Sequence, residues 1–336
     1  MERQSRSERM SESDSKTIPD SSGPLSSLAD QIKRSMAEAL SAEQQRLAEE
    51  EEQKAQKPED PRPRVAIAEA LRNNWFEYWY QPKIDLKRKC LAGAEALARI
   101  RHPQHGVLLP GSFLADVDED SIAELAQHTF IAAMGDWSVF EDAGFNLKLS
   151  INVPVNVLFK LPAAQLVSEY RPKSERWPGL IVEVTEDQIV RDMAMAQEVA
   201  TRLLASDIKI AIDDFGAGYS SLSSLRELPF AELKIDRSFV TRCSVDATNA
   251  AICQTVIDLA HRFSSDAVAE GVEAQTDLQA LMVMGCDFGQ GALMSPPMPK
   301  ARLLELLQQR MTKPSQRGAS PKEAMQSGGK PIGRVA

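Results

Sequence analysis

The chain has 336 residues, of which 43% are hydrophobic and 26% charged, and its formal net charge is −9 at pH 7. This composition is typical of a soluble globular protein with one large domain and tails. No apolar stretch approaches the roughly 18 residues that a membrane span requires, and the charged, serine-rich start is not a signal peptide, so we expect a cytoplasmic protein. An acidic chain is also a poor partner for nucleic-acid polymers, whose phosphates need a basic face.

Residues 1–62 are predicted to form an extension that is disordered and partly helical. Serine and charge dominate the start, which favours disorder. Four apolar residues then recur at helical spacing before an acidic run, namely Leu28, Ile32, Met36 and Leu40. This pattern predicts an amphipathic helix that either docks on a regulatory partner, forms a short coiled coil, or frays in solution. Residues 313–336, rich in proline, glycine and serine, are predicted to be a disordered tail.

Between residues 63 and 312 the chain repeats one pattern, in which an apolar run ends in a polar residue and a segment of helical periodicity follows. Most run ends recur at roughly 20 to 35 residues, the length of one βα unit, with a longer first interval. Eight runs over about 245 residues predict the α/β class and a (β/α)8 TIM-like barrel. The expected strands are 75–86, 91–97, 147–152, 180–186, 208–214, 231–236, 266–273 and 286–291.

The first two runs are joined by a very short connection. Only residues 87–90 separate them, which is too few for a crossover helix. We therefore predict an antiparallel hairpin here, and a barrel whose first strand is reversed.

Two adjacent carboxylates, Asp213 and Asp214, end a run whose isoleucines indicate a strand buried on both faces. Such close like charges cannot both stay ionised in a partly desolvated site unless a cation shares them. A helix cap in a βα loop is the alternative interpretation of this pair.

The C-terminal strand ends of a barrel converge on one mouth, which would gather seven polar side chains: Glu95, Asn152, Glu183, Asp213, Asp214, Lys234 and Glu270. Their carboxylates and amide oxygen suit Mg²⁺ or Mn²⁺ better than zinc. Two such ions about 4 Å apart would activate water for phosphoryl displacement. Lys234 would orient that water and Arg99 would bind a substrate phosphate. The pattern indicates metal-assisted phosphodiester hydrolysis, although each residue taken alone also fits a cap or a salt bridge.

Several motifs resemble those of the EAL-domain cyclic di-GMP phosphodiesterases and occur in the family's order. The Glu95-Ala-Leu97 signature precedes Arg99, and Asp213-Asp-Phe-Gly-Ala-Gly-Tyr-Ser-Ser221 follows later. The others are Tyr80-Gln-Pro82, Glu183-Val-Thr-Glu186, Leu233-Lys-Ile-Asp236, Glu270-Gly-Val-Glu273 and Gln290-Gly291. The resemblance covers about two thirds of the chain, as far as Pro299.

The resemblance implies hydrolysis of cyclic di-GMP to linear pGpG with two Mg²⁺ or Mn²⁺ ions. One ion would be held by Glu95, Asn152, Glu183 and Asp213, and the other by Asp213, Asp214 and Glu270. The implied catalytic residues are Lys234, Glu95, Glu270 and Asp213. The implied substrate-binding residues are Gln81, Arg99, Asp236 and Gln290, and the implied supporting residues are Glu186 and Glu273. The family also implies a homodimer, because the loop after Asp214 couples metal binding to dimerisation.

Departures from the family pattern include Ile100, where Trp is usual, and none of them removes a ligand. Two alternatives to the enzyme remain open: a silent relative that binds the nucleotide as a receptor and signals through its N-terminal helix, and a barrel that acts only as a scaffold. The four cysteines lack metal spacing and are expected to be reduced core or helix residues. His102 and His105 are expected in a solvated turn.

Overall fold

The structure is a computed structural model that describes residues 63–216, 226 and 228–312. The predicted N-terminal helix, most of the glycine-rich segment after Asp214 and the predicted tail lie outside these residues.

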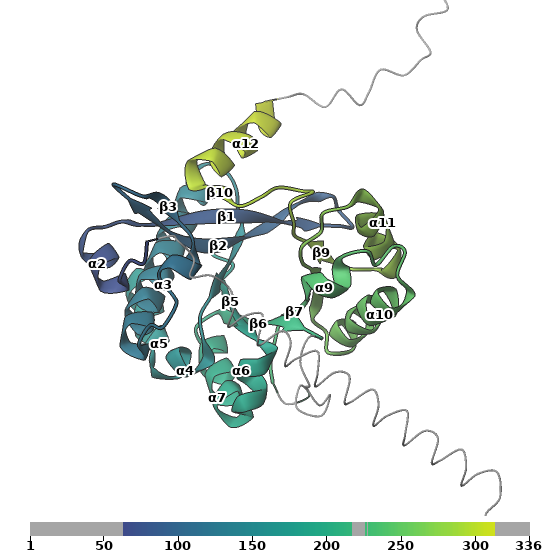
Figure 1. Ribbon diagram of the computed structural model, residues 1–336, viewed down its shortest axis with the longest axis horizontal. Helices are drawn as coiled ribbons and strands as arrows, with labels where there is room; N and C mark the ends of the chain where they lie inside the picture. The colour runs from purple at the N-terminus through teal and green to yellow at the C-terminus, as the bar shows by residue number, and fades with distance from the viewer. Residues whose placement is uncertain (1–62, 217–225, 227, 313–336) are drawn as a thin grey trace, which may run out of the picture. The chain divides into compact units, whose positions relative to one another are not determined.

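Eight strands close into a barrel, as predicted (Figure 1). The strand order is β1-β9-β8-β7-β6-β5-β4-β2, and pairing between β1 and β2 completes the circle. The strands are β1 (Phe76–Asp85), β2 (Cys90–His102), β4 (Lys148–Asn152), β5 (Leu180–Thr185), β6 (Ile208–Phe215), β7 (Glu232–Ile235), β8 (Asp266–Ala269) and β9 (Phe288–Gly289). Each lies within or beside one of the predicted apolar runs.

The first strand is reversed, which confirms the predicted hairpin. Strand β1 is antiparallel to β2, with Gln81 opposite Glu95, and also to β9, with Ile84 opposite Gly289. The other barrel pairings are parallel. Two short strands add to the edges: β3 (Gly106–Leu108) pairs with β2, and β10 (Met298–Pro299) pairs with β1.

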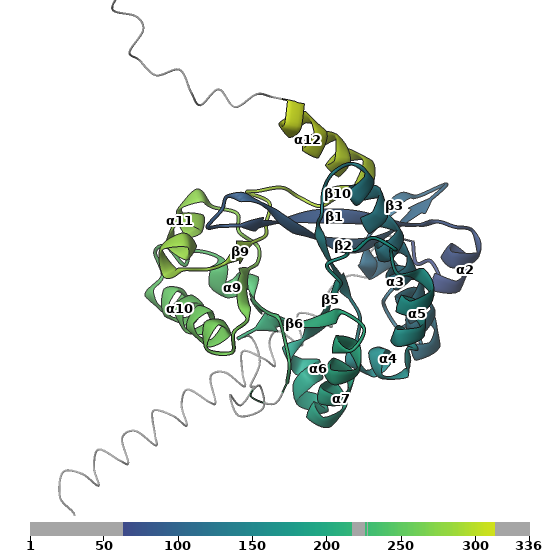
Figure 2. The ribbon, with the colours of Figure 1, turned by 180° about the vertical axis from the view of Figure 1, so that it is seen from behind.

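Helices surround the barrel on its outside (Figures 1 and 2). They are α2 (Ile67–Arg72), α3 (Glu119–Asp142), α4 (Val155–Lys160), α5 (Ala163–Tyr170), α6 (Glu186–Arg191), α7 (Met193–Leu204), α9 (Arg237–Val240), α10 (Ala247–Arg262), α11 (Gln275–Met284) and α12 (Lys300–Thr312), with the short 3₁₀ helix η1 (Pro110–Ser112) before α3. Within the described ranges, none has the length and apolar composition needed to cross a bilayer.

The hairpin has no helix of its own, so α3 and α12 cover the outer side of β1. The Tyr80 hydroxyl donates to Asp136 Oδ2 on α3 at 2.5 Å, and Lys300 at the start of α12 pairs with the same carboxylate. Through the Asp136 carboxylate, polar contacts therefore connect α3 to the reversed strand and α12 to α3.

Apolar and polar residues alternate along the strands, so the helices cover apolar faces while the barrel interior is charged. Leu149, Ile151 and Leu233 are fully buried against the helices. Inside, Lys83 and Glu232 form an ion pair at 2.5 Å, with side chains only 4% and 3% exposed. Gly93 allows close approach of the neighbouring strand β4, because a Cβ there would lie only 2.3 Å from the Lys148 carbonyl oxygen. Strand β6 is buried on both faces from Ile210 to Ile212, as predicted, whereas Lys209 near its start is exposed.

Removing Lys83 tests this interior pair. We expect Lys83→Met to lower the free energy of unfolding by about 3–5 kcal/mol, because Glu232 would be left as an unpaired buried charge. The matched change Lys160→Met, which removes an exposed partner of Glu119, should cost much less, because water and salt screen an exposed ion pair. Urea unfolding followed by circular dichroism measures both, and equal costs would contradict a net role for the buried pair.

Candidate active site

Lys234 on β7 lies at the centre of an acidic cluster in the barrel mouth. Its side chain is 1% exposed, and its Nζ lies 2.5 Å from Glu183 Oε2, 3.1 Å from Asp213 Oδ1 and 2.6 Å from Glu270 Oε1. These carboxylates come from the ends of β5, β6 and β8. The structure thus brings together residues that are up to 87 positions apart in the sequence (270 − 183).

Glu95 forms the other side of the cluster, held by two amides. Asn152 Nδ2 donates to Glu95 Oε1 at 2.7 Å, and Gln290 Nε2 donates to Glu95 Oε2. Gln290 also donates to Gln81 Oε1 at 3.1 Å. Because Asn152 uses its amide nitrogen here, its amide oxygen is left for a cation.

Asp213 and Asp214 share the mouth because β6 is irregular at its end. Adjacent side chains of a regular strand point to opposite faces. Here the pairing of β6 with β7 shifts register between Ile212 and Phe215, and Asp214 has a left-handed φ of 54°. Oxygens of Asp213, Asp214 and Glu270 consequently all lie within 4.8 Å of one another. Hard oxygen donors at this spacing fit a divalent cation such as Mg²⁺ or Mn²⁺.

The single positive charge of Lys234 does not neutralise five neighbouring carboxylates. Burial and the remaining negative charge together raise the pKa values of several of them. Burial raises the pKa of Glu95 to about 7 and that of Glu270 to about 8, in each case with further contributions from neighbouring carboxylates. Burial and the Asp213 charge raise the pKa of Asp214 to about 6. Burial also opposes ionisation of Glu183, but contact with Lys234 brings the pKa of that carboxyl below its ordinary value. The metal-free cluster therefore favours protons on several carboxylates, and divalent cations would take their place.

Glu186 connects the cluster to the start of α6. Its side chain is buried, and its Oε2 accepts a hydrogen bond from the Gly216 N–H at 2.9 Å. This contact fixes the chain directly after Asp214.

Asp236 and Glu273, also predicted as site residues, take part in contacts at the rim. Asp236 caps α9 by accepting from the Ser238 N–H at 2.8 Å, although its charge contributes to the raised pKa of Asp214. Glu273 pairs with Arg237 Nη2 at 2.8 Å and is 56% exposed. The structure therefore places Asp236 near the cluster, and it leaves Glu273 exposed in an ion pair with Arg237.

Arg99 lies on β2 beyond Glu95 and is buried. Its Nη1 donates to the Ala98 carbonyl at 2.8 Å, its guanidinium lies 5.8 Å from the Trp79 ring, and its Nε has no hydrogen-bond partner among the described residues. The neighbouring Ile100 is fully buried in a separate apolar cluster with Phe113. The family's usual Trp at this position would therefore lie on the other side of the strand from Arg99.

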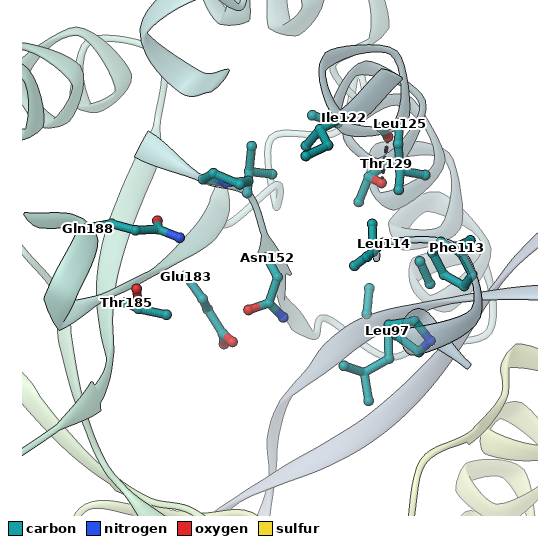
Figure 3. A pocket seen from close by; sticks show the side chains of 16 residues that line it. Leu97, Phe113, Leu114, Ile122, Leu125, Thr129, Asn152, Glu183, Thr185 and Gln188 are labelled. Carbon is teal, nitrogen blue, oxygen red and sulfur yellow. Dashed lines mark hydrogen bonds between the residues drawn. The ribbon is translucent and has the colours of Figure 1, made fainter. Parts of the chain in front are cut away.

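An apolar pocket of about 360 Å³, which the sequence pattern did not predict, lies beside the cluster (Figure 3). Figure 3 shows Asn152 and Glu183 at its polar end. Its apolar lining comes from β2, through Leu97, and from the segment between β2 and β4, which includes Phe113, Leu114, Ile122 and Leu125. The unusually long interval between the second and third predicted strands was the one signal of this extra wall.

Among the described residues, no cysteine or histidine belongs to a group of side chains that could hold a metal ion. Cys243, Cys253 and Cys286 are buried thiols, and burial raises the pKa of each, to about 11, 12 and 12. Cys90 is exposed at the start of β2, which corrects its prediction as a core or helix residue, because a hairpin turn precedes it. His102 accepts from the backbone N–H of His105 in the predicted turn.

Comparisons with known proteins agree on one family. The family model described as EAL domain matches residues 64–297. The bifunctional diguanylate cyclase/cyclic di-GMP phosphodiesterase MucR of Pseudomonas aeruginosa is 36% identical over 251 residues, covering 71% of this chain and 35% of the relative. The cyclic di-GMP phosphodiesterase RocR of the same organism is 34% identical over 246 residues, covering 72% and 63%. The chain thus matches between about a third and just under two thirds of these relatives' lengths.

Two solved structures carry the likeness into three dimensions. The PaMucR phosphodiesterase in its c-di-GMP complex superposes with a TM-score of 0.64 at 32% identity, covering 70% of this chain and 97% of that one. The manganese and cyclic di-GMP complex of BlrP1 from Klebsiella pneumoniae gives a TM-score of 0.59 at 25% identity, covering 67% and 56%.

The raised pKa of Glu270 predicts that this residue makes the stability of the metal-free protein depend on pH. A pKa of about 8, raised above the ordinary value, means that the folded state keeps a proton that the unfolded chain releases at lower pH. Without metal, ionisation of Glu270 therefore destabilises the fold as pH rises from about 5 to 8. We expect Glu270→Gln, measured in chelator by scanning calorimetry, to raise the melting temperature by about 5 °C at pH 8 and little at pH 5.

The control for this measurement is Glu198→Gln, which changes an exposed carboxylate on α7 and should leave the melting temperature unchanged at both pH values. A Glu270→Gln protein that is less stable than wild type at pH 8 would show that the ion pair with Lys234 outweighs burial.

Proposed function

Because this chain belongs to the EAL domain family, we propose that it hydrolyses cyclic di-GMP to linear pGpG with two bound Mg²⁺ or Mn²⁺ ions. The observation that carries the proposal is the surplus of carboxylates around one buried lysine. A site with this charge is suited to divalent cations, and bound cations in turn attract a dianionic dinucleotide to an acidic protein.

The proposed metal ligands divide into two groups that share Asp213. Glu95, Asn152, Glu183 and Asp213 would hold one ion, and Asp213, Asp214 and Glu270 the other. The proximity of oxygens in the second group and the free amide oxygen of Asn152 support this division. When bound, the ions would lower the pKa of a water and neutralise charge on the reacting phosphate.

Lys234 is proposed to orient the attacking water as a permanent cation. Burial alone would lower the pKa of this lysine, but Glu183 and the other carboxylates keep that pKa well above its ordinary value. A lysine so strongly protonated does not act as a general base. It would instead orient the water by donating an N–H group, once bound metal ions have replaced Lys234 as the partner of at least one of the three carboxylates that it contacts.

The substrate is proposed to lie across the mouth between the apolar pocket and Arg99. A pocket of about 360 Å³ beside Asn152 and Glu183 is within the size range of small-molecule sites and offers apolar walls to a flat base. Arg99, together with Gln81, Gln290 and Asp236, would bind the polar parts of the dinucleotide. Glu186 would support the site through Gly216, and Glu273 would support the rim through Arg237.

We also propose that the enzyme acts in the cytoplasm as a homodimer and that residues 28–40 bind a regulatory partner, on the basis of the sequence alone. The alternative of a receptor without activity is not favoured, because every proposed ligand is present in the chain.

The direct test is turnover of cyclic di-GMP by the full chain with Mg²⁺ or Mn²⁺, followed by chromatography. We expect pGpG to form, and we expect EDTA to abolish its formation because the metals activate the water. Glu95→Gln removes a ligand charge without changing side-chain volume and should lower kcat by at least about 100-fold. Glu198→Gln is the matched control with unchanged kcat. The proposal fails if the wild type forms no linear dinucleotide with either metal.

A further inference from the structure

Strands β1 and β2 continue beyond the barrel mouth as a paired ribbon, with the short strand β10 at the edge of β1 and β3 at the edge of β2. Strand β4 pairs with β2 only as far as Ala96, whereas β1 pairs with β2 as far as Ile100. The ribbon face that continues from Gln81 and Glu95 toward the mouth carries alternate residues of both strands, namely Glu77, Trp79, Leu97, Arg99 and Arg101. The opposite face belongs to α3, which Tyr78 and Tyr80 contact.

Four of these side chains form a continuous series of contacts, called here the ribbon ladder: Arg101, Glu77, Trp79 and Arg99. Arg101 binds Glu77 with two hydrogen bonds, from Nε at 2.7 Å and from Nη2 at 2.9 Å. Glu77 Oε1 also accepts from Trp79 Nε1 at 2.7 Å. The Arg99 guanidinium then lies 5.8 Å from the Trp79 ring.

Arg99 has few other restraints on its position. Within the described part of the chain, its hydrogen bond goes to the backbone of Ala98, and no side chain forms a hydrogen bond or an ion pair with it. Arg99 is only 7% exposed, and its Nε is buried without a hydrogen-bond partner among the described residues. A buried donor of this kind requires an acceptor, and a bound dinucleotide offers one.

We infer that Trp79 and Glu77 are positioning residues for Arg99 and thereby for cyclic di-GMP. Trp79 sets the plane of the guanidinium, the carboxylate of Glu77 fixes the indole, and Arg101 fixes Glu77. The ladder thus holds the Arg99 donors in place before the dinucleotide arrives, which lowers the entropy cost of binding. This inference rests on the proposed function, because it takes cyclic di-GMP as the ligand.

The test is a double-mutant cycle on binding rather than a single substitution. Calorimetry with cyclic di-GMP in Ca²⁺, which should permit binding with little hydrolysis, compares the full-length wild type, Trp79→Leu, Arg99→Ala and the double variant. If Trp79 acts through Arg99, Trp79→Leu weakens binding about tenfold in the wild type and less than about twofold in the Arg99→Ala background. Equal weakening in both backgrounds, or none in the wild type, would overturn the inference.

Further variants separate positioning from folding. Trp75→Leu removes another tryptophan at the end of the ribbon, one that packs against His102 with ring centroids 4.6 Å apart, and should leave affinity within about twofold. Trp79→Phe keeps an aromatic ring but loses the hydrogen bond to Glu77, and Glu77→Gln weakens the same bond. Each should weaken binding about threefold, and they provide the cycle if Trp79→Leu does not fold.

Kinetics in Mg²⁺ distinguish this inference from the proposed function. The ladder acts on substrate binding, so Trp79→Leu should raise KM about tenfold and leave kcat within about twofold. If the wild type binds cyclic di-GMP without forming pGpG, the proposed function fails and the ladder stands on the binding cycle. If the wild type hydrolyses it and Trp79→Leu changes neither KM nor affinity, the ladder alone is wrong.

Discussion

The structure depends on an unequal distribution of charge, in which five carboxylates gather around the single ammonium of Lys234. The barrel forces this arrangement, because parallel strands deliver their last side chains to one mouth whatever their separation in sequence. Without cations, protons compensate for the imbalance, as the raised pKa values of Glu95 and Glu270 indicate. Cations and protons therefore compete for the same oxygens, and the affinity of the proposed site for metal rises with pH.

Charge continues below the mouth into the middle of the barrel, where Lys83 and Glu232 form their ion pair. Few apolar contacts are available inside such an interior, so most of the hydrophobic stabilisation comes from the outer shell, where strand residues such as Leu149 and Ile151 pack against helices. This division lets the fold keep a polar interior for chemistry while the helices supply stability. Substitutions inside the barrel therefore change charge balance before they change packing.

The sequence alone predicted the structural elements that depend on residues close together in the chain. An apolar run that ends in a carboxylate identifies a strand and its mouth end, and the four-residue link between the first two runs excludes a crossover helix. It did not predict the pocket that Phe113, Leu114 and Leu125 line. Helical periodicity predicts a helix in this segment, but it does not predict whether a cavity forms between the helix and the barrel. The family resemblance gave Glu273 a supporting role, and no residue pattern indicated the ion pair of this side chain with Arg237. The presence of both Asp213 and Asp214 in the barrel mouth likewise depends on a local irregularity of β6, and no pattern of residue types specifies that irregularity.

The reversal of β1 changes which residues of the chain lie beside the barrel mouth. In a barrel of parallel strands, the first strand begins at the face opposite the mouth, and its upstream neighbours lie far from the chemistry. Here β1 begins at the mouth and runs away from it, so Glu77 and Trp79 come before Gln81 and lie further out. The preceding α2 packs, through Ile67, into the apolar cluster of Phe113, a residue that also lines the pocket. The fold thus places residues upstream of the barrel directly behind the pocket wall beside its opening.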